Sequence, residues 1–244
     1  MKNYFEIVKQ YLVTKQECNI LFIGDSITSA EWVHPNWREI VEYVLKEEMW
    51  KVLKKEGFDY TVPYWGIRCY NFGFDGAQSF NVLSKIHNFT RVNPDLSLVM
   101  MSRNDMDMDF PVDVHASNLS ALTLLLKKAG SEVAYSTPQH ELCDELNKKY
   151  EPYRLAALKE LKGKCDTLDL ESEYSKFDYK SFYTFISEEN KIAGVKEGEV
   201  DPSHPNMLGN AYIAKVFLDK LFGISFDPES YIETLLKGDK FPKY

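Results

Sequence analysis

The stretch NILFIGDSIT, residues 19–28, decides the fold, because it joins a short apolar run to an abrupt polar end. Its apolar part, residues 19–24, is typical of a parallel strand covered on both faces. Gly24, Asp25 and Ser26 follow the apolar core of the run at once. The strand therefore either leaves the sheet in an ordinary loop or holds Ser26 at a rigid edge, where its hydroxyl can attack a substrate. The rest of the sequence decides between these alternatives.

Strand-like runs and helical patterns alternate along the chain. Strands are predicted at 19–24, 68–73, 96–102, 132–137 and 165–170, and helices at 36–56, 78–90, 116–129, 140–162 and 205–222. This alternation predicts a three-layer α/β/α sandwich of about five parallel strands with right-handed crossovers. Residues 171–200 are rich in Tyr, Phe and charge and fit the alternation poorly. We predict an irregular excursion there, near the site.

Length and composition predict one large domain over residues 1–244, since no repeat or Pro/Gly-rich linker divides the chain. With 44% hydrophobic residues, 15 Tyr and 15 Phe, the chain has enough apolar material for a full core. No run approaches the roughly 18 apolar residues of a membrane span. The net charge of −8 is spread along the sequence without a basic stripe, which argues against nucleic acid as a partner.

The N-terminal residues and the cysteines predict a cytoplasmic protein. Residues 1–19 contain neither a continuous apolar stretch nor a small-residue cleavage site, so they do not resemble a secretory signal. The four cysteines are widely spaced and form no C-x-x-C pair, which is typical of reduced thiols. The five histidines do not pair with them at zinc-ligand spacing, so no metal is expected. The oligomeric state is not predicted.

Four polar groups stand at or near the ends of predicted strands or before the last long helix. They are GDSIT (24–28), NFGFDG (71–76), SRND (102–105) and DPSHPN (201–206). In open α/β sheets, ligands bind beyond the carboxyl ends of the strands. We therefore expect these groups to meet at one edge of the sheet and to form the functional site.

Ser26, His204 and Asp201 have the chemistry of nucleophilic catalysis. A serine hydroxyl is a weak nucleophile until a base takes its proton, and histidine is suited to that role at neutral pH. An acid must then orient the imidazole. Asp201 and His204 are three residues apart, so the carboxylate can reach Nδ1 and leave Nε2 for Ser26, 178 residues upstream.

Acyl transfer also requires donors for a developing oxyanion. The backbone N–H of Ser26 is one candidate. Gly73 and Gly76 offer a turn with an exposed N–H and no obstructing side chain. Asn104 offers a side-chain amide at the end of the third predicted strand.

In this order and spacing, the motifs GDSIT, N-x-G-x-x-G, x-x-N-D and D-x-x-H resemble those of the SGNH (GDSL) hydrolase family. The resemblance implies a flavodoxin-like sheet, hydrolysis of carboxylic esters and no cofactor. It implies Ser26 as nucleophile, completed by Asp201 and His204. It also implies Gly76, through its backbone, and Asn104, through its side chain, as oxyanion donors beside the Ser26 N–H.

One motif departs from the family pattern, in which G-x-N-D is usual where this chain has SRND. Ser102 occupies the glycine position, and its side chain is expected to narrow the pocket or shift the strand end. Arg103 is expected to add a positive charge near the site. The departure is the only sequence support for an alternative, a catalytically silent binding module with the same fold.

The sequence DMDMD (105–109) is not a calcium loop, because Phe110 and Ala116 stand where an EF-hand needs Gly and Glu. We expect a solvated acidic loop over the pocket mouth. The nearby methionines, Met100, Met101, Met106 and Met108, would suit an acyl-chain wall, with core packing favoured for the first two. Trp32, Trp37, Tyr64 and Trp65 would suit either a sugar platform or ordinary packing.

These observations predict a serine esterase that works through an acyl-enzyme on a small-molecule ester. The favoured substrate carries a short acyl group, acetyl in particular, on a carbohydrate or similar small molecule. A lysophospholipase or thioesterase acting on longer acyl chains is the enzymatic alternative.

Overall fold

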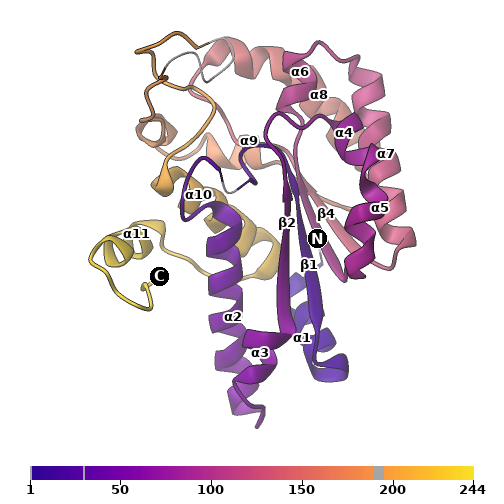
Figure 1. Cartoon of the computed structure of the whole chain (residues 1–244), viewed down its shortest axis with the longest axis vertical. Coiled ribbons are helices and arrows are strands. Elements are labelled where there is room, and N and C mark those ends of the chain that lie inside the picture. Colours follow the sequence, from indigo (N-terminus) through magenta and orange to yellow (C-terminus); the bar gives the residue numbers. More distant parts are fainter. Residues whose placement is uncertain (1, 30, 189–194) are drawn as a thin grey trace.

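The computed structural model describes residues 2–29, 31–188 and 195–244 and contains one five-stranded sheet (Figure 1). The strands are β1 (Cys18–Gly24), β2 (Ile67–Gly73), β3 (Leu96–Met100), β4 (Glu132–Ser136) and β5 (Asp166–Leu168). Their order is β2-β1-β3-β4-β5, and every neighbouring pair is parallel. The predicted parallel sheet is confirmed.

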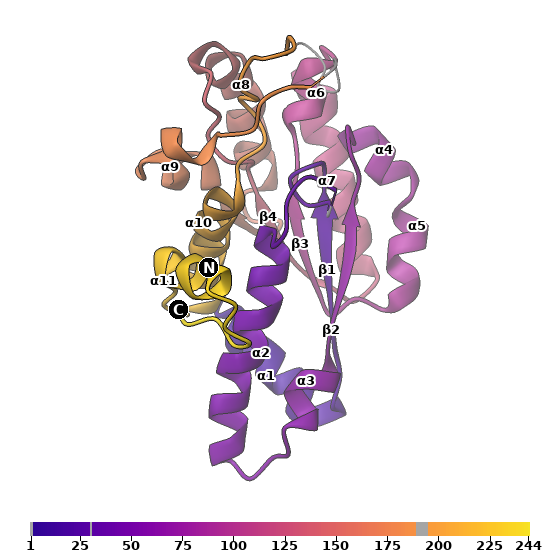
Figure 2. The same cartoon turned by 60° about the vertical axis from the view of Figure 1, so that its left-hand side comes forward.

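Helices cover both faces of the sheet, which confirms the predicted three layers (Figures 1 and 2). The longer helices are α1 (Tyr4–Lys15), α2 (Trp37–Lys55), α7 (Val112–Lys128), α8 (Asp144–Leu161), α10 (Met207–Phe217) and α11 (Pro228–Leu236). The short ones are α3 (Thr61–Gly66), α4 (Ser79–Ser84), α5 (Ile86–Phe89), α6 (Arg103–Asp107), α9 (Leu170–Tyr174), the 3-10 helices η1 (Thr90–Val92) and η2 (Tyr179–Phe182), and the π-helical turn η3 (Leu218–Phe222). That the whole chain forms one domain stays a prediction.

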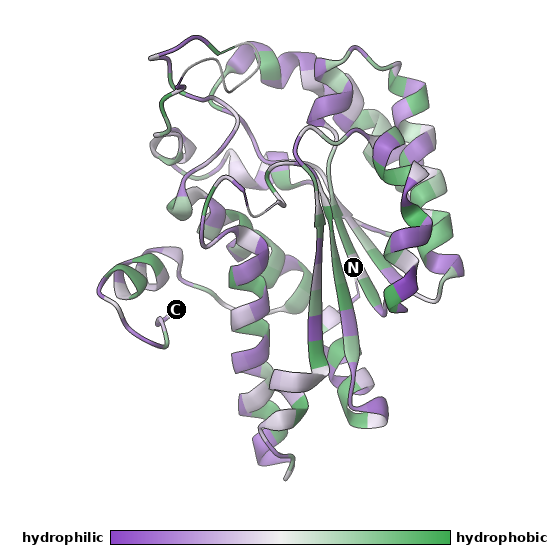
Figure 3. Cartoon of the chain, viewed as in Figure 1, coloured by the Kyte–Doolittle hydropathy of each residue, from purple (hydrophilic) through white to green (hydrophobic). Residues whose placement is uncertain are grey.

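The apolar run of residues 19–24 is buried on both sides, as a central parallel strand must be. Ile20 and Phe22 belong to the core shared with α1, α2 and α10, whereas Leu21 and Ile23 belong to the core shared with α4, α7 and α8. Burying each of these side chains contributes about 1.5–3 kcal/mol. Figure 3 shows this apolar character along the strands. Among the described residues, no helix is long and apolar enough to cross a membrane.

Two glycines let the loop after β1 pack against the strand ends. Gly24 pairs with Gly73 on β2 and with Met100 on β3. A Cβ atom at Gly24 would lie 2.5 Å from the Met100 carbonyl oxygen, and one at Gly73 would lie 2.5 Å from the Ser29 backbone nitrogen. Both approaches are closer than side chains tolerate, so glycine is required at each position.

Several predicted boundaries were wrong. The helix predicted at 78–90 is interrupted at Lys85, where the backbone leaves helical geometry (φ −103°, ψ 4°). The helix predicted at 140–162 begins only at Asp144, because Leu142 instead donates its N–H to Pro202 O at 2.9 Å. The strands predicted at 96–102 and 165–170 end at Met100 and Leu168. The helix predicted at 116–129 begins earlier, at Val112.

The segment 171–200 is an irregular excursion, as predicted, over the part that the structure describes. It contains the end of α9 and the short helix η2, and one isolated antiparallel bridge joins Ile186 to Val200. Residues 189–194 of the predicted excursion lie outside the described residues. The sheet's carboxyl edge, the excursion and the loops after β1 and β2 lie at the same end of the molecule (Figure 1).

Candidate active site

Ser26 stands in a tight turn directly after β1. Thr28 and Ser29 donate their backbone N–H groups to Asp25 O at 3.0 Å each, and Ile27 N–H donates to Asp25 Oδ1 at 3.2 Å. Within residues 18–29, Ser26 alone is not buried. A rigid strand and a hydrogen-bonded turn therefore present this one hydroxyl at the edge of the sheet. This favours a strand that holds Ser26 at a rigid edge over an ordinary exit into a loop.

Asp201, His204 and Ser26 form one hydrogen-bonded chain. His204 Nδ1 lies 2.7 Å from Asp201 Oδ2, and His204 Nε2 lies 2.8 Å from Ser26 Oγ. Asp201 is fully buried, and its second oxygen, Oδ1, accepts the backbone N–H groups of Ser203 and His204 at 2.9 and 3.2 Å. Each carboxylate oxygen thus has its own partner, and the imidazole is fixed with Nε2 toward the serine.

The loop that carries Asp201 and His204 is held from both sides. On one side, Leu142 N–H donates to Pro202 O, and the Gln139 side chain donates to Ser203 O at 2.9 Å. On the other side, Asn206 caps α10 by accepting the Gly209 N–H at 3.0 Å. The histidine therefore sits on a braced loop next to a helix start.

Trp32 covers the outer face of the histidine ring. Its ring centroid lies 3.9 Å from that of His204, and the two planes differ by only 9°. The Trp32 indole N–H donates to Asp75 Oδ1 at 2.8 Å, and the Ser29 hydroxyl donates to the same oxygen at 3.1 Å. The sequence singled out Trp32 as an aromatic residue but did not predict its contact with the histidine.

The side chain of Asn104 is bonded to the segment that follows Gly76, so two of the predicted oxyanion donors belong to neighbouring segments. The Asn104 amide donates to Ala77 O at 3.1 Å, one residue beyond Gly76. Gly76 is exposed and has φ +65°, a conformation that glycine adopts without strain. Gly73 N–H is already engaged with Asn71 Oδ1 at 2.9 Å, so Gly76 is the better candidate donor of the two glycines.

Asp105 also connects the segment of Asn104 to the start of α4, through Ser79. This carboxylate is fully buried, and it accepts the backbone N–H of Ser79 at 2.9 Å and the Ser79 hydroxyl at 2.5 Å. The expectation of a solvated acidic loop over 105–109 is thus wrong for Asp105, whereas Asp107 and Asp109 are exposed. Asp105 follows Asn104 in the chain, and Ser79 follows the Gly76 turn. The two bonds between Asp105 and Ser79 therefore hold the segment of Asn104 beside the segment of Gly76.

The side chain of Ser102, which stands where the family pattern has glycine, faces the core. Ser102 is fully buried, and its hydroxyl lies 2.8 Å from the Tyr135 hydroxyl. Arg103 is also buried: its guanidinium donates to Gln139 O at 2.8 Å and lies over the Tyr150 ring at 4.1 Å. Its Nε stands 3.6 Å from Glu141 Oε1. The expected extra positive charge is therefore paired within the core.

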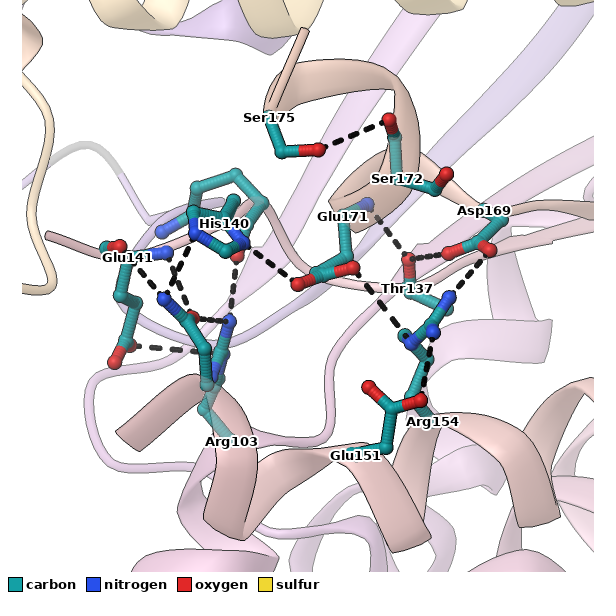
Figure 4. A network of polar contacts seen from close by, with 12 residues as sticks. Arg103, Thr137, His140, Glu141, Glu151, Arg154, Asp169, Glu171, Ser172 and Ser175 are labelled. Carbon is teal, nitrogen blue, oxygen red and sulfur yellow. Dashed lines mark hydrogen bonds and ion pairs between the residues drawn. The ribbon is translucent and has the colours of Figure 1, made fainter. Parts of the chain in front are cut away.

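Arg103 and Glu141 belong to a polar network that extends to α8 and α9 (Figure 4). His140 Nδ1 lies 2.7 Å from Glu171 Oε1, and Arg154 lies 2.5 Å from Asp169 Oδ2. Burial raises the pKa of Glu141, although Arg103 opposes the shift. Burial also acts to raise the pKa of Glu171, but the His140 hydrogen bond and nearby charges outweigh it and lower that pKa. The network fixes residues 137–141 beside the Asp201–His204 loop.

The methionines and aromatic residues divide between core and surface. Met100, Met101 and Met106 are buried, and Met108 alone of the four is exposed, at 67%. The core role predicted for Met100 and Met101 is thus confirmed. Trp37 is fully buried, whereas Trp65 is 70% exposed.

Asp25 provides a pH-dependent test of the turn that holds Ser26. Burial raises its pKa to about 6, opposed by the Ile27 N–H bond and by His204. Because the folded-state pKa exceeds the unfolded value, the charged carboxylate destabilises the fold above about pH 6, and this cost is relieved as the pH falls toward 4. We expect Asp25→Asn to raise the free energy of unfolding at pH 8 by about 2–3 kcal/mol.

Urea unfolding at several pH values measures this effect. The advantage of Asp25→Asn over the original chain should shrink between pH 6 and pH 4, since the introduced amide cannot ionise but its oxygen can still accept the Ile27 N–H. Asp113→Asn, at an exposed position on α7, is the control and should change stability by less than about 0.5 kcal/mol. An Asp25→Asn variant that is less stable than the original chain at pH 8 would contradict the argument.

Comparisons with known proteins were made on both sequence and structure. No model of a known protein family matches the chain, and no curated protein matches it. Among solved structures, Axe2, an acetylxylan esterase from Geobacillus stearothermophilus, matches with a TM-score of 0.62 at 19% identity, over 87% of this chain and 98% of that chain. A lipase/acylhydrolase from Enterococcus faecalis matches with a TM-score of 0.60 at 14% identity, over 84% and 96%.

These matches define the class of fold. At such identities the likeness concerns the fold, and this chain has the three-layer α/β/α fold of those two proteins. At that level, the resemblance to SGNH hydrolases is confirmed. Three further matching structures are catalytic mutants of Axe2, in which a serine, an aspartate or a histidine is replaced by alanine. In Axe2, that aspartate and histidine are three positions apart.

Proposed function

We propose that this protein is a serine hydrolase of the SGNH type that cleaves carboxylic esters through an acyl-enzyme. One observation carries the proposal: Asp201, His204 and Ser26 form a continuous chain with contacts of 2.7 and 2.8 Å. This is the geometry in which a histidine takes a serine proton while a carboxylate holds the imidazole. The fold shared with two ester hydrolases supports it, as does the Asp-x-x-His spacing shared with Axe2.

In the first half of the reaction, His204 Nε2 takes the proton of Ser26 as Oγ bonds to the carbonyl carbon of the ester. The tetrahedral intermediate then collapses, the ester C–O bond breaks, and the imidazolium gives its proton to the departing alcohol. In the second half, His204 takes a proton from water, and the resulting hydroxide adds to the acyl carbon. The acid leaves, and the proton returns to Ser26 Oγ.

We assign the oxyanion donors to Ser26 N–H, Gly76 N–H and the Asn104 amide. Asn104 has two amide hydrogens, and Ala77 O accepts one of them, which leaves the other for a ligand. The bond to Ala77 O also ties Asn104 to the Gly76 turn. Donors fixed before the reaction stabilise the developing charge without having to reorganise.

Asn104→Ala should lower kcat by about 10²- to 10³-fold with little change in KM, since a donor of this kind acts mainly in the transition state. Steady-state hydrolysis of p-nitrophenyl acetate measures both constants. Asn81→Ala is the control, because it also removes a side-chain amide. The oxygen of that amide accepts the Gln78 N–H, and Asn81 is not part of the proposed site. An Asn104→Ala enzyme within threefold of the original kcat would remove Asn104 from the assignment.

For the substrate, we propose a short acyl group, acetyl in particular, on a carbohydrate or similar small molecule. The likeness to an acetylxylan esterase supports this choice. A panel of nitrophenyl esters from acetyl to dodecanoyl, run beside acetylated xylo-oligosaccharides with Ser26→Ala as blank, tests it. kcat/KM should be highest for acetyl. A maximum at eight carbons or more would instead favour the lysophospholipase or thioesterase alternative.

A further inference from the structure

Trp32 is the one aromatic residue in contact with the proposed catalytic base among the residues that the structure describes. Its indole lies flat on the imidazole of His204, with centroids 3.9 Å apart and planes 9° apart. Trp32 lies in an irregular segment between β1 and α2, with neither helix nor strand to fix its position. An indole in such a segment holds a defined stack only if other contacts fix it.

Asp75 supplies that fixation. Its Oδ1 accepts the Trp32 indole N–H at 2.8 Å and lies 3.1 Å from the Ser29 hydroxyl, whose single hydrogen is shared between this oxygen and Ser26 O, also at 3.1 Å. Asp75 is the residue before Gly76, in the turn to which the oxyanion role is assigned. One carboxylate therefore connects the tryptophan, the nucleophile turn and the candidate oxyanion turn.

From this arrangement we infer that Trp32 is a positioning residue for His204, held in place by Asp75, and that its indole face stabilises the imidazolium formed during the reaction. The inference rests on the proposed function. A cation over the face of an indole is attracted by the ring quadrupole, and tryptophan is the strongest of the aromatic residues in this respect. The interaction strengthens when His204 takes the Ser26 proton, so it lowers the barrier to that step.

Other charged groups also face the histidine. Asp201 contacts its Nδ1, and the buried carboxyls of Asp25 and Glu141 interact with it electrostatically. Behind the indole, Asp75 contacts Trp32 and interacts with Glu31. Substituting Trp32 leaves all of these carboxyl groups in the chain but removes the N–H that Asp75 accepts, so variants of Asp75 are needed to separate the contribution of the ring face from the change at that carboxylate.

A sugar platform is the competing role for Trp32, and the substrate separates the two. p-Nitrophenyl acetate has no sugar, and a fluorophosphonate reports the reactivity of Ser26 directly. We compare Trp32→Phe, which keeps an aromatic face, with Trp32→Leu, which keeps apolar cover but has no ring. Thermal unfolding of each variant verifies that it is folded.

For Trp32→Leu we expect kcat for p-nitrophenyl acetate and the fluorophosphonate rate to fall about 3- to 10-fold, in line with a cation–π contact at a partly buried site. The acidic limb of the kcat/KM profile should move to lower pH by about 0.5–1 unit, because the protonated imidazole loses its partner. Trp32→Phe, which keeps an aromatic face but lacks the indole N–H that Asp75 accepts, should recover part of both effects. Asp75→Leu, which removes the anchor and keeps the ring, should resemble Trp32→Phe, whereas Asp75→Asn, which keeps an acceptor oxygen, should be milder.

Two outcomes would overturn the inference while the original enzyme stays active. The first is equal behaviour of Trp32→Phe and Trp32→Leu, with unchanged pH profiles. The second is a rise in KM for acetylated sugars alone, with normal rates on p-nitrophenyl acetate, which would assign Trp32 to the sugar. An original chain that neither hydrolyses esters nor reacts with the fluorophosphonate would instead defeat the proposed function itself.

Discussion

Ser26→Ala should abolish ester hydrolysis, lowering kcat for p-nitrophenyl acetate by about 10⁴- to 10⁶-fold. The variant loses the only atom that can form the acyl-enzyme, and His204 loses the hydroxyl that lies 2.8 Å from its Nε2. The fold should be unaffected, because Ser26 Oγ has no hydrogen-bond partner other than His204 among the described residues. Steady-state kinetics together with circular dichroism measure the two effects separately.

Ser84→Ala is the matched control for that substitution. Its hydroxyl is exposed on α4 and donates only to the Asn81 carbonyl within the part of the chain that the structure describes. We expect activity within twofold of the original chain. A Ser26→Ala enzyme that keeps full activity would show that another group attacks the ester.

Asp201→Asn should lower kcat by about 10⁴-fold, an effect nearly as large as loss of the nucleophile. The reason is the position of the two carboxylate oxygens. Oδ1 accepts two backbone N–H groups, so in the variant the amide oxygen stays there and the amide nitrogen faces His204 Nδ1. An amide N–H at that place forces the imidazole to carry its proton on Nε2, where it can no longer accept the proton of Ser26.

Asp227→Asn is a close control, because Asp227 also accepts two backbone N–H groups, from Glu229 and Ser230 at the start of α11. It shares the loop geometry of Asp201 but has no contact with His204 among its described bonds. The activity of the Asp227→Asn variant should match that of the original chain. A loss of less than tenfold for Asp201→Asn, at unchanged stability, would show that the carboxylate does not set the tautomer.

The layers of the fold could be predicted from the sequence because each strand is a short apolar run, and such runs need cover on both faces. Residues 19–24 are the clearest case, since Ile20 and Leu21 pack into opposite cores. Boundaries were harder, because they depend on contacts with distant segments. The late start of α8 is an example: Leu142 bonds Pro202, sixty residues away, and no local pattern reveals this.

The proposed catalytic residues could be predicted because each belongs to a short local motif at the end of an element. The residues that fix them could not. Trp32 contacts His204 and Asp75 across long stretches of sequence, and nothing in its own neighbourhood distinguishes it from a packing residue. Arg103 is the opposite case. Its position in the motif predicted a positive charge at the site, but the guanidinium is buried, where it lies beside Glu141 and over the Tyr150 ring.

The most direct test of the central claim is covalent labelling with a fluorophosphonate, located by mass spectrometry of the digested protein. Only a serine activated by a neighbouring base reacts at an appreciable rate. We predict one adduct, on Ser26, that is lost in His204→Ala and absent from Ser26→Ala. No adduct on the folded original chain, or one that persists on another residue in Ser26→Ala, would contradict the account.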